Sequence, residues 1–294
     1  MTTQASSPFR GRTNGDPPRG AGDGSEHLDV TFLGHSTVLF EIGGKRFLTD
    51  PILSRVIKIW PRLDGNRVRA RHLTEIDVVL VSHAHMDHCD LPTLRKLPKT
   101  ATIVTPQNLG DLVGDLGFAE HVELMTWSSW VSDGARVTAV PARHFGQRYY
   151  TDRHRGYCGY VVEYLGRSFY FSGDTAYFQG FARIGERFRI DVACLPIGAY
   201  IPRFIMQPVH TNPREAVQAF IDMRASYMVP IHWGTFKLSL EPMSQPRRWL
   251  ERIAKRRGLA ERVSIIPHGE SRRFTFPEAE ERTERSAARD SHPA

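Results

Sequence analysis

Histidine and aspartate side chains are crowded into one short stretch of this sequence, "VSHAHMDHCD" at residues 81–90. His83, His85 and His88 stand with Asp87 within six positions, directly after a run of β-branched residues. These imidazoles would repel one another if protonated and would be costly to bury without partners, so a bound cation explains them best. Imidazole and carboxylate ligands suit zinc, with manganese and iron as rivals. A hydrogen-bonded polar turn is the alternative.

Six residues cannot complete a metal site, so further ligands are expected at the ends of other strands. Three polar residues follow apolar runs: His144 after "RVTAVPAR", Asp174 in "FYFSGDT" and His232 in "YMVPIHWGT". Taken singly, such an aspartate is usually a turn residue, and such a histidine is often hydrogen-bonded inside a core. Taken together, the three can gather with the first cluster at one edge of a sheet.

The apolar pattern predicts strands alternating with helices. Gly43 and Gly44 join two strands as a hairpin, and Asn212 with Glu215 gives a late helix a capping-box start. Strand runs punctuated by helices predict sheets packed face to face with helices outside, in the α/β (α+β) class. The expected strands cover residues 28–33, 37–42, 45–50, 76–82, 136–140, 159–165, 167–173 and 190–198, and the expected helices cover residues 91–97, 108–117, 213–223 and 245–258.

Composition predicts a soluble globular protein with one folded region. Of the 294 residues, 40% are hydrophobic and 24% are charged, which is ordinary for this class. Residues 1–27 and 278–294 lack apolar periodicity, so we expect disordered tails around a domain at residues 28–277. The three cysteines are too few and too scattered for a disulfide framework, and Cys89 is expected to be a small buried thiol.

The charge pattern and the lack of an apolar span bear on location and partners. No signal sequence opens the chain, and no window approaches the roughly 20 apolar residues of a membrane span, so we expect a cytoplasmic protein. The net charge of +7 favours phosphodiesters, nucleic acid or a lipid surface, although a solvated basic surface explains it equally well. Residues 54–63, "SRVIKIWPRL", are expected either to pack on the domain or to contact the inner membrane face peripherally.

The order of these motifs resembles the metallo-β-lactamase fold family. "HAHMDH", a later lone histidine, the aspartate of "SGDT" and a final histidine match the metal motifs of that family in order. The resemblance implies an αββα sandwich with two divalent metal ions, zinc first, at one edge of its sheets. It implies a first metal held by His83, His85 and His144, a second held by Asp87, His88 and His232, a bridging Asp174, and an Asp50 that orients the ligating imidazoles.

A narrower resemblance, over about residues 28–272, is to the branch that contains the phospholipase D acting on N-acylphosphatidylethanolamine. It rests on "FLGHSTVLFE", "FLTDPI", "LPIGAYIPRFIMQPVHTNPREAV", "PIHWGTF" and "PHGESR". It implies a lipid phosphodiesterase with Asp87, Asp174 and His210 in catalysis, and with Arg203 and Phe145 facing the substrate. Phe145 stands where the phospholipase has a tryptophan, a departure that would reshape the acyl-chain channel.

Two alternatives stand beside a phospholipid substrate. The same site could hydrolyse a soluble phosphorylated lactone or another phosphoester. A non-catalytic metal-binding or nucleic-acid-binding module belongs to another class. Because all seven ligand positions are filled, that class is disfavoured and no nucleic-acid partner is expected. His35, in "GHST", is expected near the mouth of the site without binding metal.

Overall fold

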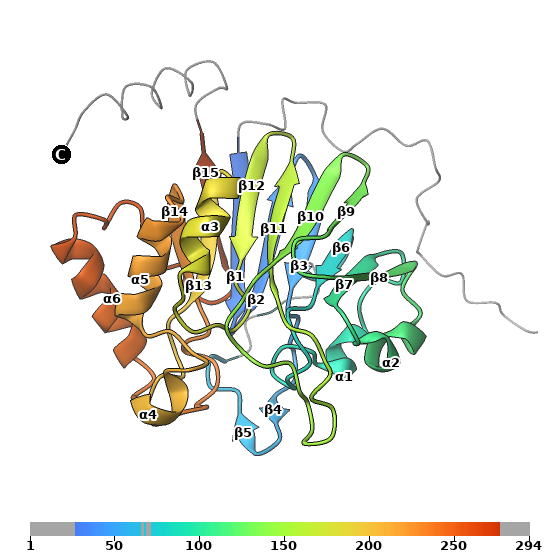
Figure 1. Cartoon of the computed structure of the whole chain (residues 1–294), viewed down its shortest axis with the longest axis horizontal. Helices are drawn as coiled ribbons and strands as arrows, with labels where there is room; N and C mark the ends of the chain where they lie inside the picture. The colour runs from blue at the N-terminus through green and yellow to red at the C-terminus, as the bar shows by residue number, and fades with distance from the viewer. Residues whose placement is uncertain (1–26, 66–67, 69–71, 277–294) are drawn as a thin grey trace, which may run out of the picture.

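Two β-sheets stacked face to face form the centre of the protein (Figure 1). The computed structural model describes residues 27–65, 68 and 72–276. One sheet has the strand order β15-β1-β2-β3-β6-β7-β8 and the other the order β14-β13-β12-β11-β10-β9. The strands are β1 (His27–Gly34), β2 (Thr37–Ile42), β3 (Lys45–Thr49), β6 (Val78–Leu80), β7 (Thr102–Pro106), β8 (Glu120–Leu124), β9 (Ser129–Ser132), β10 (Ala135–Val140), β11 (Gly159–Tyr164), β12 (Arg167–Phe171), β13 (Val192–Pro196), β14 (Tyr227–Ile231) and β15 (Glu270–Thr275), with β4 (Val56–Ile57) and β5 (Trp60–Pro61) as a separate hairpin.

Alternating side chains of the strands fill two different apolar layers, as the period of two in a strand requires. In β2, Phe40 packs in the large core between the sheets, and Leu39 packs in a second core on the outer face. Phe40 stacks on Phe169 of β12 with ring centroids 3.7 Å apart, so the two sheets are in direct contact. The hairpin expected at Gly43 and Gly44 is confirmed, and both glycines have the positive φ that its tight turn requires.

Helices cover both outer faces and complete the αββα sandwich that was expected. Leu94 of α1 and Val113 of α2 pack on the seven-stranded sheet. Phe181 of α3, Phe220 of α5 and Leu250 of α6 pack on the six-stranded sheet. The helices are α1 (Leu91–Leu94), α2 (Gly110–Val113), α3 (Gly180–Arg187), α4 (Arg203–Met206), α5 (Pro213–Asp222) and α6 (Gln245–Arg256), with a 3₁₀ turn at Gly114–Leu116.

Several expected elements are present with shorter bounds. The helix expected at residues 91–97 ends at Leu94, and the one expected at 108–117 begins at Gly110 and passes into a 3₁₀ turn. The capping box of α5 is confirmed, because the Asn212 side chain accepts from the Glu215 amide and the Glu215 carboxylate accepts from the Asn212 amide. The expected tails lie outside the described residues except for His27, which begins β1. Every helix among the described residues is too short or too polar to cross a membrane.

Candidate metal centre

The first histidines of "HAHMDH" are placed by the end of strand β6 and the turn that follows it. Backbone hydrogen bonds from His88 and Cys89 to the His85 carbonyl form a turn over residues 85–89. His83 Nε2 lies 2.8 Å from His85 Nδ1, and His144 Nε2 lies 3.3 Å from the same atom. These three residues form one group whose nitrogens could hold a metal ion together.

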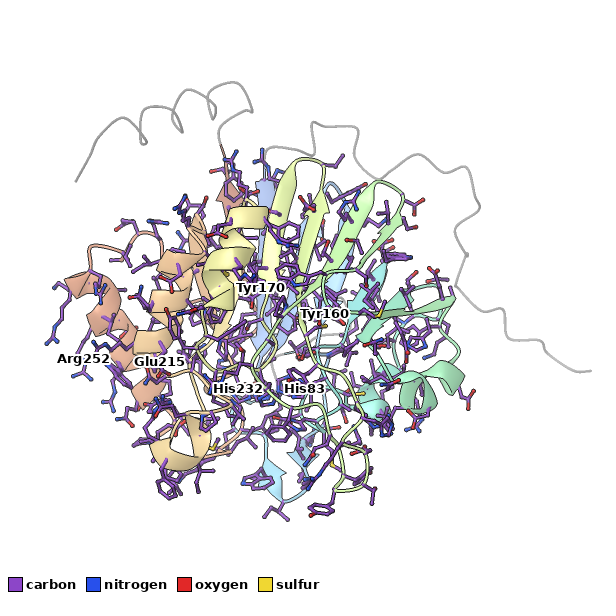
Figure 2. All side chains as sticks on the ribbon, in the orientation of Figure 1. His83, Tyr160, Tyr170, Glu215, His232 and Arg252 are labelled. Carbon is purple, nitrogen blue, oxygen red and sulfur yellow. The ribbon has the colours of Figure 1, made fainter. Side chains whose placement is uncertain are left out.

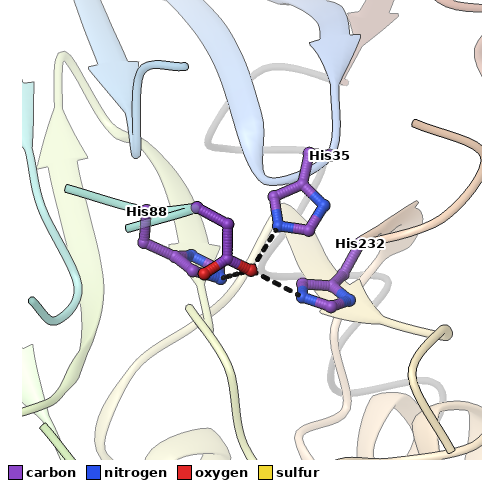
Figure 3. A group of neighbouring side chains, drawn as sticks. His35, His88 and His232 are labelled. Atoms are coloured by element: carbon purple, nitrogen blue, oxygen red, sulfur yellow. Dashed lines mark hydrogen bonds and ion pairs between the residues drawn. The ribbon is translucent and has the colours of Figure 1, made fainter. Parts of the chain in front are cut away.

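A second group gathers around the carboxylate of Asp87 (Figure 3). Asp87 Oδ2 lies 3.0 Å from His35 Nε2, 3.5 Å from His88 Nε2 and 3.8 Å from His232 Nε2. His232 follows β14 and belongs to the opposite sheet, so this group exists only because the two sheets meet at this edge. Figure 2 shows His83 and His232 near each other below the strands.

Asp174, just after β12, lies between the two groups. Its Oδ2 atom is 3.1 Å from His88 Nε2 and 3.3 Å from His232 Nε2, both in the second group. The same atom is 4.0 Å from His144 Nε2 in the first group. One carboxylate oxygen is therefore within reach of both sets of nitrogens, which is the place that a bridging ligand would take.

Asp50 orients the imidazoles from behind. Its Oδ2 atom accepts hydrogen bonds from His88 Nδ1 and from Ser82 Oγ, each at 2.6 Å, and its Oδ1 atom accepts from the Ser82 amide. Ser82 Oγ is in turn 2.9 Å from His83 Nδ1. Because the Nδ1 atoms of both histidines are engaged, their Nε2 atoms are left facing the centre. The residues preceding the histidines thus fix which nitrogen each one offers.

Buried atoms without hydrogen-bond partners show that a cation fits this site. Four buried atoms have no hydrogen-bond partner among the described residues: His88 Nε2, His232 Nε2, His210 Nδ1 and Asp174 Oδ1. Native proteins rarely leave such atoms unsatisfied unless an ion or another group completes them. The donor set of imidazole and carboxylate is the one that divalent metals take in hydrolases.

The pKa values reflect this crowding of buried charge. Burial lowers the pKa of His83, His85 and His144, which keeps the first group neutral and ready to donate lone pairs. Burial opposes protonation of His232 as well, but Asp174 outweighs it and raises the pKa of His232 to about 9. Burial would raise the pKa of Asp174, yet His232 and its neighbours hold it well below the usual range. Asp174 is therefore anionic at neutral pH.

His35 differs from its expected position at the mouth of the site. It is almost fully buried and contacts Asp87, and its ring is tilted by 45° against that of His232 with ring centroids 4.1 Å apart. Burial first, and repulsion from His232 second, lower its pKa to about 3. Its backbone has a positive φ, as do those of Asp50 and His232, and such backbone strain in non-glycine residues is typical of functional sites. In the sequence, the "GHST" turn was the only local sign that His35 belongs to the site, and the serine of "VSH" was the only such sign for Ser82.

The remaining candidates lie around this centre. Phe145 is exposed, and its ring lies 4.7 Å from that of His85 and 4.8 Å from that of His144. His210 Nδ1 lies 3.8 Å from Asp174 Oδ2. Arg203 donates to Glu215 at 2.6 Å and to the His210 carbonyl, so a protein carboxylate already pairs with the arginine that was expected to face a phosphate. Burial raises the pKa of the Cys89 thiol to about 12, in keeping with the inert thiol expected there.

Gly198 gives a test of how tightly the second group is held. A Cβ atom at this position would collide with the backbone carbonyl oxygen of His232. We expect Gly198→Ala to push His232 away from Asp87, to lower the free energy of unfolding by about 1–3 kcal/mol and to weaken metal binding. Thermal unfolding and metal titration of the purified variant measure both effects.

The matched control is Gly114→Ala, because a Cβ at Gly114 has open space around it and the backbone is helical there. This control should be neutral or slightly stabilising. Equal stability and equal metal affinity in the two variants would contradict the close approach of Gly198 to His232.

Comparisons with known proteins also indicate a metal-dependent hydrolase of the beta-lactamase superfamily. A family model described as a beta-lactamase superfamily domain matches residues 45–233. The chain is 36% identical over 238 residues to an uncharacterised protein of Mycobacterium bovis, covering 76% of this chain and 63% of that protein. It is 34% identical over 248 residues to the N-acyl-phosphatidylethanolamine-hydrolyzing phospholipase D 1 of Caenorhabditis elegans, covering 77% of this chain and 69% of that one. A metallo hydrolase structure from Ignicoccus hospitalis superposes with a TM-score of 0.65 at 23% identity, covering 85% of this chain and 100% of that one.

Proposed function

This chain is a metal-dependent hydrolase of the metallo-β-lactamase superfamily, in the branch of the N-acylphosphatidylethanolamine-hydrolysing phospholipases D, and we propose that it acts on the same lipid. The proposed reaction is cleavage of N-acylphosphatidylethanolamine. The products are N-acylethanolamine and phosphatidic acid. The chain spans 63% of the length of its mycobacterial relative, and the relative from Caenorhabditis elegans supports the choice of substrate. The observation that carries the proposal is Asp174 Oδ2, which lies within 4.0 Å of imidazole nitrogens from both groups.

Two divalent metal ions, zinc by the preference of a histidine-rich donor set, are proposed as cofactors. His83, His85 and His144 would hold one, Asp87, His88 and His232 would hold the other, and Asp174 would bridge them. When bound, such ions supply positive charge for the phosphate oxygens and lower the pKa of a water to near neutrality. His35, hydrogen-bonded to Asp87, fixes the orientation of that carboxylate.

The chain itself supplies orientation and proton transfer. In hydrolysis, a water oxygen forms a bond to phosphorus while the bond from phosphorus to the ethanolamine oxygen breaks. The leaving oxygen needs a proton, and the attacking water loses one. His210 has a buried ring nitrogen 3.8 Å from Asp174 Oδ2, and burial lowers its pKa to about 4, so its neutral ring can take the proton of the water and pass it to the leaving oxygen. Phe145, exposed against His85 and His144, gives the acyl or glyceride chains an apolar contact at the entrance.

Product mass spectrometry tests the substrate. The zinc-loaded protein is incubated with N-acylphosphatidylethanolamine in mixed micelles, beside a chelator-treated sample. We expect N-acylethanolamine and phosphatidic acid to accumulate in the loaded sample only. Absence of both products from protein shown to contain metal would exclude this lipid. The same preparation would then be assayed with soluble phosphorylated lactones and other phosphoesters, which the same metal centre could hydrolyse.

A further inference from the structure

Exposed apolar side chains gather in segments that adjoin the loops of the metal centre. Among the described residues, fourteen large hydrophobic side chains are exposed, and ten of them lie in four short segments, residues 55–63, 145–157, 203–205 and 237–240, which we call the rim. Ile59, Tyr150 and Phe204 are each about 80% exposed. Soluble proteins rarely concentrate apolar surface in this way unless it meets a partner. The ten residues are Val56, Ile59, Leu63, Phe145, Tyr149, Tyr150, Tyr157, Phe204, Ile205 and Leu240.

Hydrogen bonds attach the rim segments to the loops that carry the candidate ligands. The Leu63 amide donates to the Thr235 carbonyl, three residues after His232. Arg148 donates to the carbonyls of Ala84 and Cys89, inside and beside "HAHMDH". The rim is therefore held against the centre and does not lie on a remote surface.

Hydrogen bonds also hold the last two rim segments, residues 203–205 and 237–240, in place near the metal centre. Arg203 donates to the His210 carbonyl, which ties α4 to the candidate proton donor. The Leu240 amide donates to the Ile201 carbonyl, which holds residues 237–240 beside the start of α4.

The rim segments share one end of the molecule. In Figure 1 the β4–β5 hairpin, the loop that joins β10 to β11 and helix α4 all lie at the lower end, beyond the ends of both sheets. The labels of His83 and His232 in Figure 2 lie between this end and the strands. A flat surface that touched the rim would thus face the metal centre.

The exposed charges of the rim are all positive. Arg55, Lys58, Arg153 and Lys237 are exposed, and none of them forms an ion pair with another described residue. The only carboxylate in the rim segments is Asp152, which is buried and paired with Arg155. Exposed apolar side chains interleaved with unpaired cations suit the interface of an anionic lipid bilayer, where the rings and aliphatic chains enter and the cations meet headgroups.

We propose that the rim docks this protein onto an anionic phospholipid membrane, so that its metal centre opens directly toward the headgroups. The role of this docking rests on the proposed lipid substrate. The docking itself is inferred from the exposed apolar side chains and the positive charge of the rim. An aromatic and aliphatic rim explains how a protein whose described helices do not cross a membrane reaches a lipid phosphodiester.

Vesicle cosedimentation tests the docking without any substrate present. The full chain is mixed with vesicles of phosphatidylcholine alone, or of phosphatidylcholine and phosphatidylglycerol at about 7:3, neither of which contains N-acylphosphatidylethanolamine. We expect binding to the anionic vesicles that weakens with salt, and a fall on the order of tenfold or more in Ile59→Ser/Phe204→Ser. In Lys58→Ala/Arg153→Ala we expect a fall of about fivefold for each cation removed, on anionic vesicles only.

The control pair is Met125→Ser/Val131→Ser, two exposed apolar residues outside the rim, and it should bind like the parent chain. Circular dichroism and metal content check that each variant is folded. The proposal is overturned if the parent chain stays in the supernatant with both vesicle types, or if the rim pair binds as well as the control pair. Self-association through the rim without vesicle binding would also overturn it. Since no substrate is present, failure of docking is distinct from failure of lipid hydrolysis.

Discussion

Asp174→Asn is expected to lower turnover by at least about 10³-fold while the protein stays folded. The substitution keeps the shape of the side chain but removes the negative charge that faces His88, His232 and His144. An amide cannot bridge two cations as a carboxylate does, so metal content should fall together with activity. Metal analysis of the purified variant and hydrolysis of N-acylphosphatidylethanolamine measure the two effects.

The control for Asp174→Asn is Asp133→Asn, which removes a carboxylate that is 86% exposed and, among the described residues, forms an ion pair with Lys45 alone. We expect this variant to match the parent chain in metal content and in rate, since exposed ion pairs contribute little. Full activity in Asp174→Asn, with the parent's metal content, would show that Asp174 does not bridge metal ions.

Removal of metal should both abolish turnover and destabilise the protein. The centre gathers two carboxylates among five imidazoles, and three of their buried atoms lack a hydrogen-bond partner among the described residues. A bound cation satisfies those atoms. A ligand at 100 times its dissociation constant stabilises the folded state by about 2.7 kcal/mol. For a protein of this size that corresponds to a fall in Tm of roughly 5–10 °C on chelation. Thermal unfolding with and without chelator, followed by addition of zinc, measures the shift and its reversal.

The chelation experiment has its own control in His88→Ala. This variant loses a nitrogen of the second group, together with the hydrogen bond to Asp50. We expect it to unfold at a lower temperature than the parent, and to respond less to chelator because part of the metal is already lost. An equal chelator shift in the two proteins would place the stabilising metal outside this centre.

Local apolar patterns were enough to predict most of the inner strands, but they missed the inner strand β7 and several strands at the edges of the sheets. Strand β2 alternates between two cores, and strand β12 is buried along its whole length, so their own side chains encode their position. Strand β15 exposes five of its six residues and becomes a strand by pairing with β1, about 240 positions earlier. No local periodicity predicts such an edge strand, and β8 and β9 were missed for the same reason.

Helix α3 was also not predicted from its own sequence, because tertiary packing stabilises it. It contains Gly180 and Gly185, and glycine lowers helix propensity, so its sequence did not indicate a helix. A Cβ at Gly185 would collide with the backbone of Met223, just after α5. The glycine therefore permits α3 and α5 to approach closely, and this packing, together with burial of Phe181 and Ile184, stabilises the helix.

The sequence by itself determined the chemistry of the centre, because seven histidines and aspartates of the right types stand after strand-forming runs in a recognisable order. The tertiary structure alone decided how they combine. His35 joins Asp87 because the His35 amide donates to the Thr235 side chain, 200 positions away, which draws this turn into the second group. Asp174 reaches both groups because the two sheets end at the same edge. Residue types and local turns are encoded over a few positions, whereas the distances among ligands from two sheets depend on the packing of the whole core.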